Sequence, residues 1–205
     1  MIEALHLGAP ASLMQAAVEA RNISSGKELR GEMAAAFGGP ERLKHDRLPD
    51  RAAMLEALEG AMIGAKVCAY AQGFEVLRRA SDAFDWNLDL AAIARVWRAG
   101  CIIRSVLLDD ISEAFEKDQS QQLQFAPKFQ ALLQDNSANL QKVCAEAVEA
   151  GIEAPALLAA LSYHNAGRTE RSTANMIQGL RDRFGAHTFE RVDDPGTKVN
   201  GPWHD

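Results

Sequence analysis

An arginine and a histidine lie on either side of a helix-breaking glycine near the C-terminal end of the chain. Arg181 precedes Gly185 within an apolar helical pattern, and His187 follows it. Glycine is common just past a helix end because it adopts a positive φ at little steric cost. Arginine contacts phosphate or carboxylate with two parallel hydrogen bonds, and histidine adds a titratable cation. The spacing predicts part of an anion site.

The same residues also permit a simpler interpretation. An arginine near a helix C-terminus interacts favourably with the helix dipole, and a histidine beyond it can be a surface side chain. Arg21 lies in a helix that is expected to start near Ala11, where a lone arginine is usually solvated or salt-bridged. From the residues alone, both interpretations stay open for all three side chains.

The elements that must position these residues are helices. Apolar residues recur at spacings of three and four along the chain, without a convincing two-residue alternation. Asp50 is expected to cap a long helix that runs to about Ala80 and is followed by a break at Trp86–Asn87. The pattern then restarts at Ile93, with Gly100 expected to allow a close contact between helices.

Later helices are expected after Asn136–Ser137 as a cap, from Pro155 towards Tyr163, and from about Arg171 to Phe184. The segments Phe37–Pro49 and Gln119–Lys128 have the composition of connections. Residues 192–205 have no helical pattern and are expected to form an irregular tail. The sequence therefore predicts an all-α domain of about six to eight helices over residues 1–191.

Composition restricts the class of function. The 205-residue chain has a formal net charge of −6, which gives no support for binding to nucleic acid or to a membrane surface. No apolar run of about 18 residues suggests a membrane span, and the N-terminus lacks a secretory pattern. Three widely spaced cysteines form no metal-binding motif and are expected to be reduced, buried thiols. These observations favour a cytoplasmic protein without a metal site.

Several blocks, in order, resemble one family. Residues 174–191 read ANMIQGLRDRFGAHTFER, close to the family pattern ANLIQAQRDYFGAHTYER. Earlier blocks agree with it as well: ALHLGAP at 4–10, AVEARNISS at 17–25, AYAQGF at 69–74 and WRAGCIIRS at 97–105. The chain thus resembles the C-terminal all-helical domain of 6-phosphogluconate dehydrogenase (decarboxylating), over nearly its whole length.

The resemblance implies a function. The family oxidises 6-phosphogluconate with NADP and releases carbon dioxide to give ribulose 5-phosphate, in the pentose phosphate pathway and in gluconate utilisation. It implies that Arg21 contacts the substrate phosphate, and that Arg181 and His187 complete the site of the neighbouring subunit in a homodimer. The family's Rossmann domain, which binds NADP, and its catalytic lysine and glutamate precede the part that this chain resembles. No catalytic residue is therefore assigned here, and the isolated chain is expected to show no dehydrogenase turnover.

The missing cofactor domain and an altered tail leave an alternative open, and two departures from the family pattern bear on how subunits would dock. The family segment DxYRxExLPAN stands here as NAGRTERSTAN at 165–175, and the tail usually close to GxFHTEW reads GTKVNGPWHD at 196–205. A non-catalytic helical dimer that acts as a scaffold or regulatory module would also fit. Among other cations, Lys27 and Arg30 could add positive potential near Arg21, and Arg104 is expected to be a partly buried residue that ties helices together.

Overall fold

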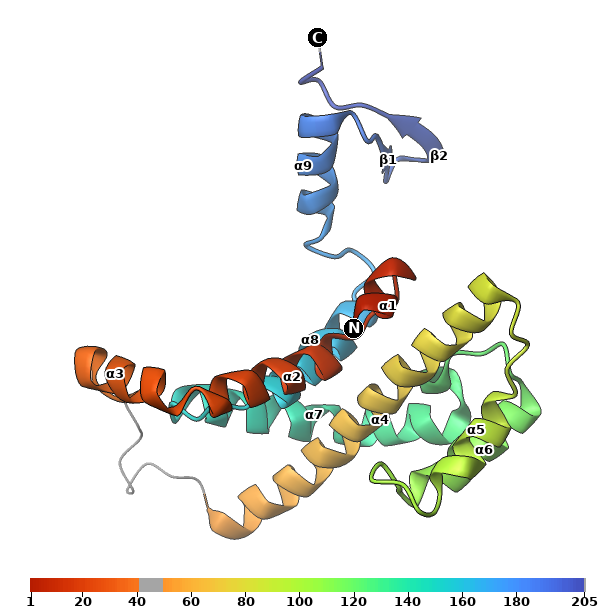
Figure 1. Ribbon diagram of the computed structural model, residues 1–205. Helices are drawn as coiled ribbons and strands as arrows, with labels where there is room; N and C mark the ends of the chain where they lie inside the picture. The colour runs from red at the N-terminus through yellow and green to blue at the C-terminus, as the bar shows by residue number, and fades with distance from the viewer. Residues whose placement is uncertain (41–49, 205) are drawn as a thin grey trace. The chain divides into compact units, whose positions relative to one another are not determined.

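The computed structural model describes residues 1–40 and 50–204, and within them the chain is all-α as predicted (Figure 1). It divides into two compact units, Met1–His164 and Asn165–Asp205. The described residues form nine α-helices, one more than the upper end of the predicted range. Most of the predicted connection Phe37–Pro49 lies outside the described residues.

The first unit contains the larger set of helices. They are α1 (Ile2–His6), α2 (Ser12–Ser25), α3 (Lys27–Phe37), α4 (Arg51–Phe84), α5 (Leu90–Trp97), α6 (Leu107–Lys117) and α7 (Pro127–Glu149), with a short 3₁₀ turn η2 (Leu123–Phe125) and α8 (Pro155–Gly167), which begins in this unit. None of the helices searched, all within the described residues, is long and apolar enough to cross a membrane.

The long helix α4 is the central element of the first unit; its predicted start is confirmed, and it runs to Phe84, four residues past the predicted end. The Asp50 carboxylate accepts a hydrogen bond from the backbone N–H of Ala53 at 2.9 Å and caps the first turn. At the other end, Asp85 and Asn87 adopt left-handed φ values of 53° and 50°, which stop the helix. Helix α7 packs along α4, and the α5–α6 pair lies near the C-terminal half of α4 (Figure 1).

The predicted start of α7 at Asn136–Ser137 was wrong, because the helix begins at Pro127. Proline at the first helical position has no N–H to leave unpaired. Asn136 lies inside the helix, where its side-chain amide donates to the carbonyl of Leu132 at 2.9 Å. It faces Gly60 of α4, so this asparagine belongs to the contact between the two helices rather than to a cap.

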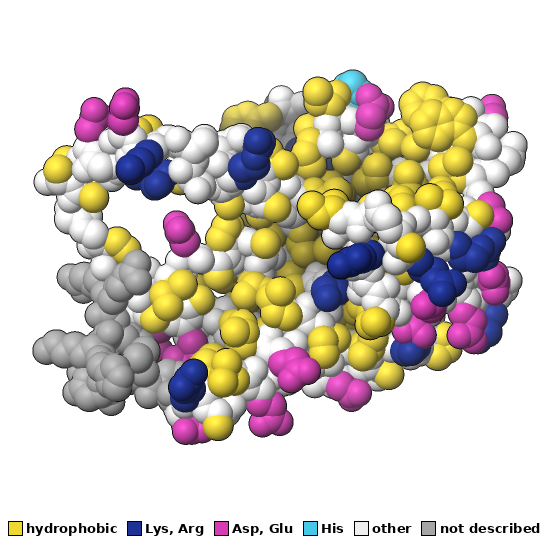
Figure 2. Space-filling view, turned by 60° about the horizontal axis from the view of Figure 1, so that its bottom comes forward, with side chains coloured by type: hydrophobic (Ala, Val, Ile, Leu, Met, Phe, Trp, Pro, Cys, Tyr) yellow, Lys and Arg dark blue, Asp and Glu magenta, His cyan; other side chains and the backbone are white. Residues whose placement is uncertain are grey.

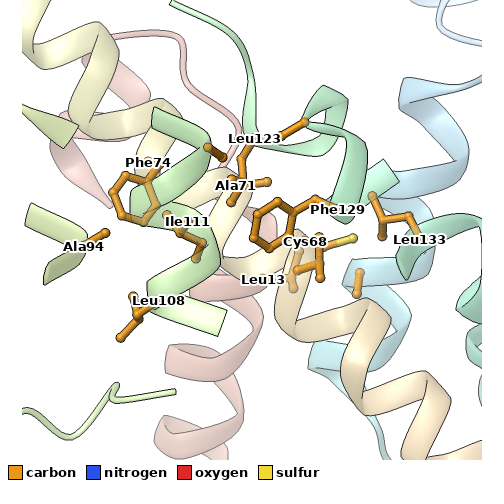
Figure 3. Packing of buried hydrophobic residues seen from close by; sticks show 14 of the residues in the cluster. Leu13, Cys68, Ala71, Phe74, Ala94, Leu108, Ile111, Leu123, Phe129 and Leu133 are labelled. Atoms are coloured by element: carbon orange, nitrogen blue, oxygen red, sulfur yellow. The ribbon is translucent and has the colours of Figure 1, made fainter. Parts of the chain in front are cut away.

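The core of the first unit collects side chains from α4, α5, α6 and α7 (Figure 3). Phe74 of α4 packs against Phe115 of α6, with ring centroids 4.9 Å apart. Cys68 and Cys144 are buried free thiols, as predicted, and burial raises the pKa of Cys68 to about 11. Cys101 differs, because it is only partly buried.

The stretch between α5 and α6 contradicts two expectations. Gly100 has a φ of +70°, and a Cβ there would meet no described residue within 4 Å, so it serves a turn and not a helix contact. The Arg104 side chain is exposed and makes no hydrogen bond or ion pair with the described residues. Tyr70 instead fixes this stretch, by donating from its hydroxyl to the carbonyl of Ile103.

The second unit contains α9 (Asn175–Gly185) and an antiparallel hairpin of β1 (Phe189–Arg191) and β2 (Asp194–Val199). The irregular tail expected for residues 192–205 is therefore wrong for 194–199, and the predicted boundary at 191 falls inside this unit. Gly196 takes a φ of +90° in the hairpin, and its N–H donates to the Glu190 carboxylate. Phe189 pairs with Val199 across the hairpin, and a register shift between Glu190 and Arg191 interrupts the regular pairing of such short strands.

Candidate anion-binding site

Helix α9 and the loop that follows it bring Arg181 and His187 to the same surface hollow. The hollow measures about 380 Å³, and its lining is otherwise apolar except for a glycine backbone: Ile177, Leu180, Arg181, Phe184, Gly185 and His187. Both candidate side chains are exposed. Apolar neighbours reduce the local dielectric, so a cation beside them attracts an anion more strongly than it would in open water.

Gly185 acts differently from its predicted role. It remains in α9, and the residue in the left-handed region is Ala186, with a φ of 50°. A Cβ on Gly185 would lie 2.9 Å from Cδ2 and 3.0 Å from Nε2 of His187. Real Cβ atoms do not approach side chains so closely, so the glycine is what allows the imidazole to lie against the end of the helix.

Thr188 follows His187 in an unfavourable backbone conformation. Its φ is +57°, a region that β-branched residues rarely occupy and that costs roughly 1–3 kcal/mol. Its N–H donates to the Asp182 carboxylate at 2.8 Å, and its carbonyl accepts from the Gln178 side chain at 2.6 Å. These two hydrogen bonds hold the loop that carries His187.

The Asp182 carboxylate is fully buried and joins α9 to the tail. Besides Thr188, it accepts hydrogen bonds from the Gly201 N–H at 2.8 Å and the Trp203 indole at 2.9 Å, and the His204 ring lies 3.6 Å away. Burial alone would raise the pKa of Asp182, but the hydrogen bonds from Gly201, Thr188 and Trp203, with His204 nearby, hold that pKa below its ordinary value.

Arg21 lies in the other unit, on a part of α2 that has no buried residue. Its side chain makes no hydrogen bond or ion pair with the residues that the structure describes. Arg30 of α3 does not remain a free cation, because its guanidinium donates to the carbonyls of Ile23 and Ser24 at the end of α2. Within one unit the structure therefore brings together Arg181 and His187, but not Arg21.

Sequence reasoning missed Gln178 and Asp182. Gln178 stands three residues before Arg181, and this spacing places two side chains on the same helix face, so a local signal existed. Indeed its Oε1 accepts from Arg181 Nη1 at 3.1 Å. No comparable signal existed for Asp182, because its partners follow it by up to 22 residues across a hairpin.

Comparison with known proteins identifies the family. The family model described as "6-phosphogluconate dehydrogenase, C-terminal domain" matches residues 1–203. The chain is 39% identical to the decarboxylating 6-phosphogluconate dehydrogenase of Rattus norvegicus over 98% of this chain and 42% of that protein. It is 41% identical to a Bacillus subtilis relative named as NAD(+)-dependent, over 95% of this chain and 42% of that protein.

A solved structure of 6-phosphogluconate dehydrogenase from Plasmodium falciparum matches with a TM-score of 0.90 and 34% identity, over 99% of this chain and 43% of that one. Its title describes an apo form and complexes with the cofactor NADP+ and the substrate 6-phosphogluconate. The present chain spans about two fifths of the length of these relatives. By sequence and by fold, the chain belongs to the 6-phosphogluconate dehydrogenase family and corresponds to its C-terminal domain.

Proposed function

We propose that this chain provides the substrate-binding and dimerisation part of an enzyme that oxidatively decarboxylates 6-phosphogluconate to ribulose 5-phosphate in the pentose phosphate pathway or gluconate utilisation. The observation that carries the proposal is that Arg181 and His187 line one hollow in a chain that matches the family over residues 1–203. Arg21, Arg181 and His187 are the residues to which we assign substrate binding.

The chemistry of the hollow suits a sugar phosphate. The Arg181 guanidinium offers two parallel N–H groups to phosphate oxygens, and the His187 imidazole offers a further donor. Apolar side chains such as Leu180 and Phe184 line the remainder of the hollow. A doubly charged phosphate needs several donors to offset its desolvation, so these two side chains are expected to act together with Arg21.

Two copies of the chain would supply one complete site. Arg21 is exposed in the first unit, whereas Arg181 and His187 belong to the second. Large apolar side chains on α2, α3 and the first half of α4 are also exposed: Val18, Ile23, Leu29, Met33, Phe37, Leu55 and Met62. Figure 2 shows exposed hydrophobic side chains spread over one face of the molecule. Such a surface is typical of an interface, and we propose a homodimer.

The dinucleotide and the acid–base groups belong elsewhere in this proposal. NADP, together with the catalytic lysine and glutamate of the family, would be held by a dinucleotide-binding part outside the segment that matches here. One relative of this chain is named NAD(+)-dependent and the matching Plasmodium falciparum enzyme is described in complex with NADP+, so similarity to this domain does not by itself assign the dinucleotide. A cytoplasmic location is proposed because the buried cysteines are free thiols.

The test is a titration of the purified chain with 6-phosphogluconate and, in parallel, with gluconate, which lacks the phosphate. We expect only 6-phosphogluconate to bind, and Arg181→Ala to weaken binding by at least about tenfold, the effect of one lost charged hydrogen bond. Arg183→Ala is the matched control, because Arg183 is an exposed arginine on the same helix but does not line the hollow.

Mixing variants tests whether the site is shared between copies. A dimer of one Arg21→Ala chain and one Arg181→Ala chain should regain one intact site and bind more tightly than a dimer of either variant alone. Failure of the mixture to bind would place Arg21 outside the site or in the same copy as Arg181. A dimer that binds neither ligand in any form would instead favour the scaffold alternative.

A further inference from the structure

We infer that Gln178 and Asp182 are positioning residues, which hold the Arg181 guanidinium and the His187 imidazole in one fixed arrangement at the hollow. Neither of the two lines the hollow itself, so each acts through its neighbours and not as a ligand. The role of this arrangement in substrate binding rests on the proposed function, but the arrangement itself can be tested without substrate.

The Gln178 side chain links Arg181 to Thr188, the residue that follows His187. Its Oε1 accepts from Arg181 Nη1 at 3.1 Å, and its Nε2 donates to the Thr188 carbonyl at 2.6 Å. A flipped amide would turn its NH₂ towards the guanidinium and its oxygen towards the carbonyl, which would replace two attractions with two repulsions. One planar amide therefore couples the arginine on the helix to the loop that carries the histidine.

Asp182 holds the same peptide from the opposite side. Its buried Oδ1 accepts a hydrogen bond from the Thr188 N–H at 2.8 Å, so the backbone N–H and carbonyl of Thr188 are both bonded to side chains of α9. These contacts retain Thr188 at a φ of +57°, which the residue would otherwise leave. The loop backbone that precedes it is held as well, since the N–H of left-handed Ala186 donates to the Asp182 carbonyl at 2.8 Å.

A fixed arrangement matters because exposed side chains lose conformational freedom when they bind a ligand. Arginine has many rotamers, and a histidine on a free loop would sample many positions. Holding both groups in place before the anion arrives removes part of that entropic cost, which raises affinity without any new contact. The two residues thus contribute to substrate binding without touching the substrate.

The experiment compares three variants of the full chain by nuclear magnetic resonance. Gln178→Leu removes both contacts of the amide, and leucine is itself a good helix former, so α9 should persist. Gln178→Glu keeps an acceptor for Arg181 but loses the donor to Thr188. Gln15→Leu is the control, because Gln15 is an exposed glutamine whose amide, among the described residues, donates its side-chain hydrogen bond to Glu19 of its own helix.

The first readout needs no ligand. In Gln178→Leu we expect the Thr188 amide to exchange its hydrogen about tenfold faster, the effect of one lost hydrogen bond, and the His187 ring resonances to shift. Gln178→Glu should show the same change at Thr188, while Gln15→Leu should match the wild type. Unchanged Thr188 exchange and an unchanged His187 ring in Gln178→Leu would overturn the inference.

The second readout is titration with 6-phosphogluconate. If the wild type binds, Gln178→Leu should bind about tenfold more weakly, and equal affinity would overturn the proposed role in binding. If the wild type does not bind, the proposed function fails, whereas the Thr188 and His187 signals still decide whether the two residues fix the loop. Asp182→Asn is a second variant for measuring Thr188 exchange, although it also removes contacts to the C-terminal tail.

Discussion

The Asp182 carboxylate on α9 accepts a 2.9 Å hydrogen bond from the indole nitrogen of Trp203, near the C-terminal end of the chain. The same buried carboxylate also receives the N–H groups of Thr188 and Gly201. A buried carboxylate without hydrogen-bond partners would be costly, so this carboxylate favours the conformation in which all three donors reach it. The end of the chain is therefore tied to the helix that carries Arg181.

This relationship predicts a loss of tail structure in acid. The folded pKa of Asp182 lies below its ordinary value of 3.8, so its contribution to stability is fully present above that pH. It is lost as the pH falls through the folded pKa, because protonation removes the acceptor. The indole N–H resonance of Trp203 should therefore shift only below about pH 3.8.

Asp182→Asn is the control for this pH dependence. An asparagine has one acceptor oxygen and an NH₂ group that would oppose the donors. In this variant the chemical shift of the Trp203 indole N–H should differ from wild type at all pH values and should not change with pH. A Trp203 transition in wild type above pH 5, or one that persists in Asp182→Asn, would contradict the assignment to this carboxylate.

Gly185→Ala should separate helix stability from site geometry. Alanine favours the helix by about 1 kcal/mol over glycine, so helicity by circular dichroism should not fall. The new Cβ would lie 2.9 Å from the His187 ring, which must move away from the helix end. We expect binding of 6-phosphogluconate to weaken about tenfold, as for the loss of one hydrogen bond. Retained affinity would show that the ring position is not required.

Gly60→Ala and Gly73→Ala should have opposite effects on one helix. A Cβ at Gly60 would lie 2.4 Å from the Asn139 amide and 3.0 Å from its Cβ, so α4 and α7 must separate. Overpacking of this kind costs about 1–3 kcal/mol. A Cβ at Gly73 meets nothing within 4 Å, and alanine there should stabilise by about 1 kcal/mol.

Urea unfolding monitored by circular dichroism measures both changes. Each variant adds one methyl group to α4, so helix propensity alone would change the free energy of unfolding of both in the same direction. If both stabilised the protein, the close approach of α4 and α7 at Gly60 would be refuted.

Met33→Glu should weaken the proposed dimer without unfolding the chain. Met33 is 52% exposed on α3, a helix with no buried residue, so a carboxylate is tolerated in the monomer. Burying it in an apolar interface would raise the dissociation constant about a hundredfold, equivalent to about 2.7 kcal/mol. Light scattering over a dilution series measures this, with Val148→Glu on α7 as the control. An unchanged molar mass would place the interface elsewhere.

Much of the helical architecture could be predicted from local sequence. Asp50 capping a long helix and a break at Trp86–Asn87 depend on neighbouring residues alone; the cap was confirmed, and Asn87 lies in the break with a left-handed φ. The start of α7 was wrong because asparagine is as suitable for a helix contact as for a cap, and only the position of α4 decides between them. The β hairpin was missed because its pairing joins residues that show no local alternation.

The sequence by itself determined that the chain is helical, that it belongs to this family, and that Arg181 and His187 flank the end of a helix. Only the tertiary structure decided how those two side chains are held. Gln178 and Asp182 bond both sides of Thr188, and Gly185 leaves room for the imidazole instead of taking the left-handed turn. The physical reason is that periodicity and capping are local properties, whereas hydrogen-bond partners and close approaches depend on which distant backbone folds back onto the helix.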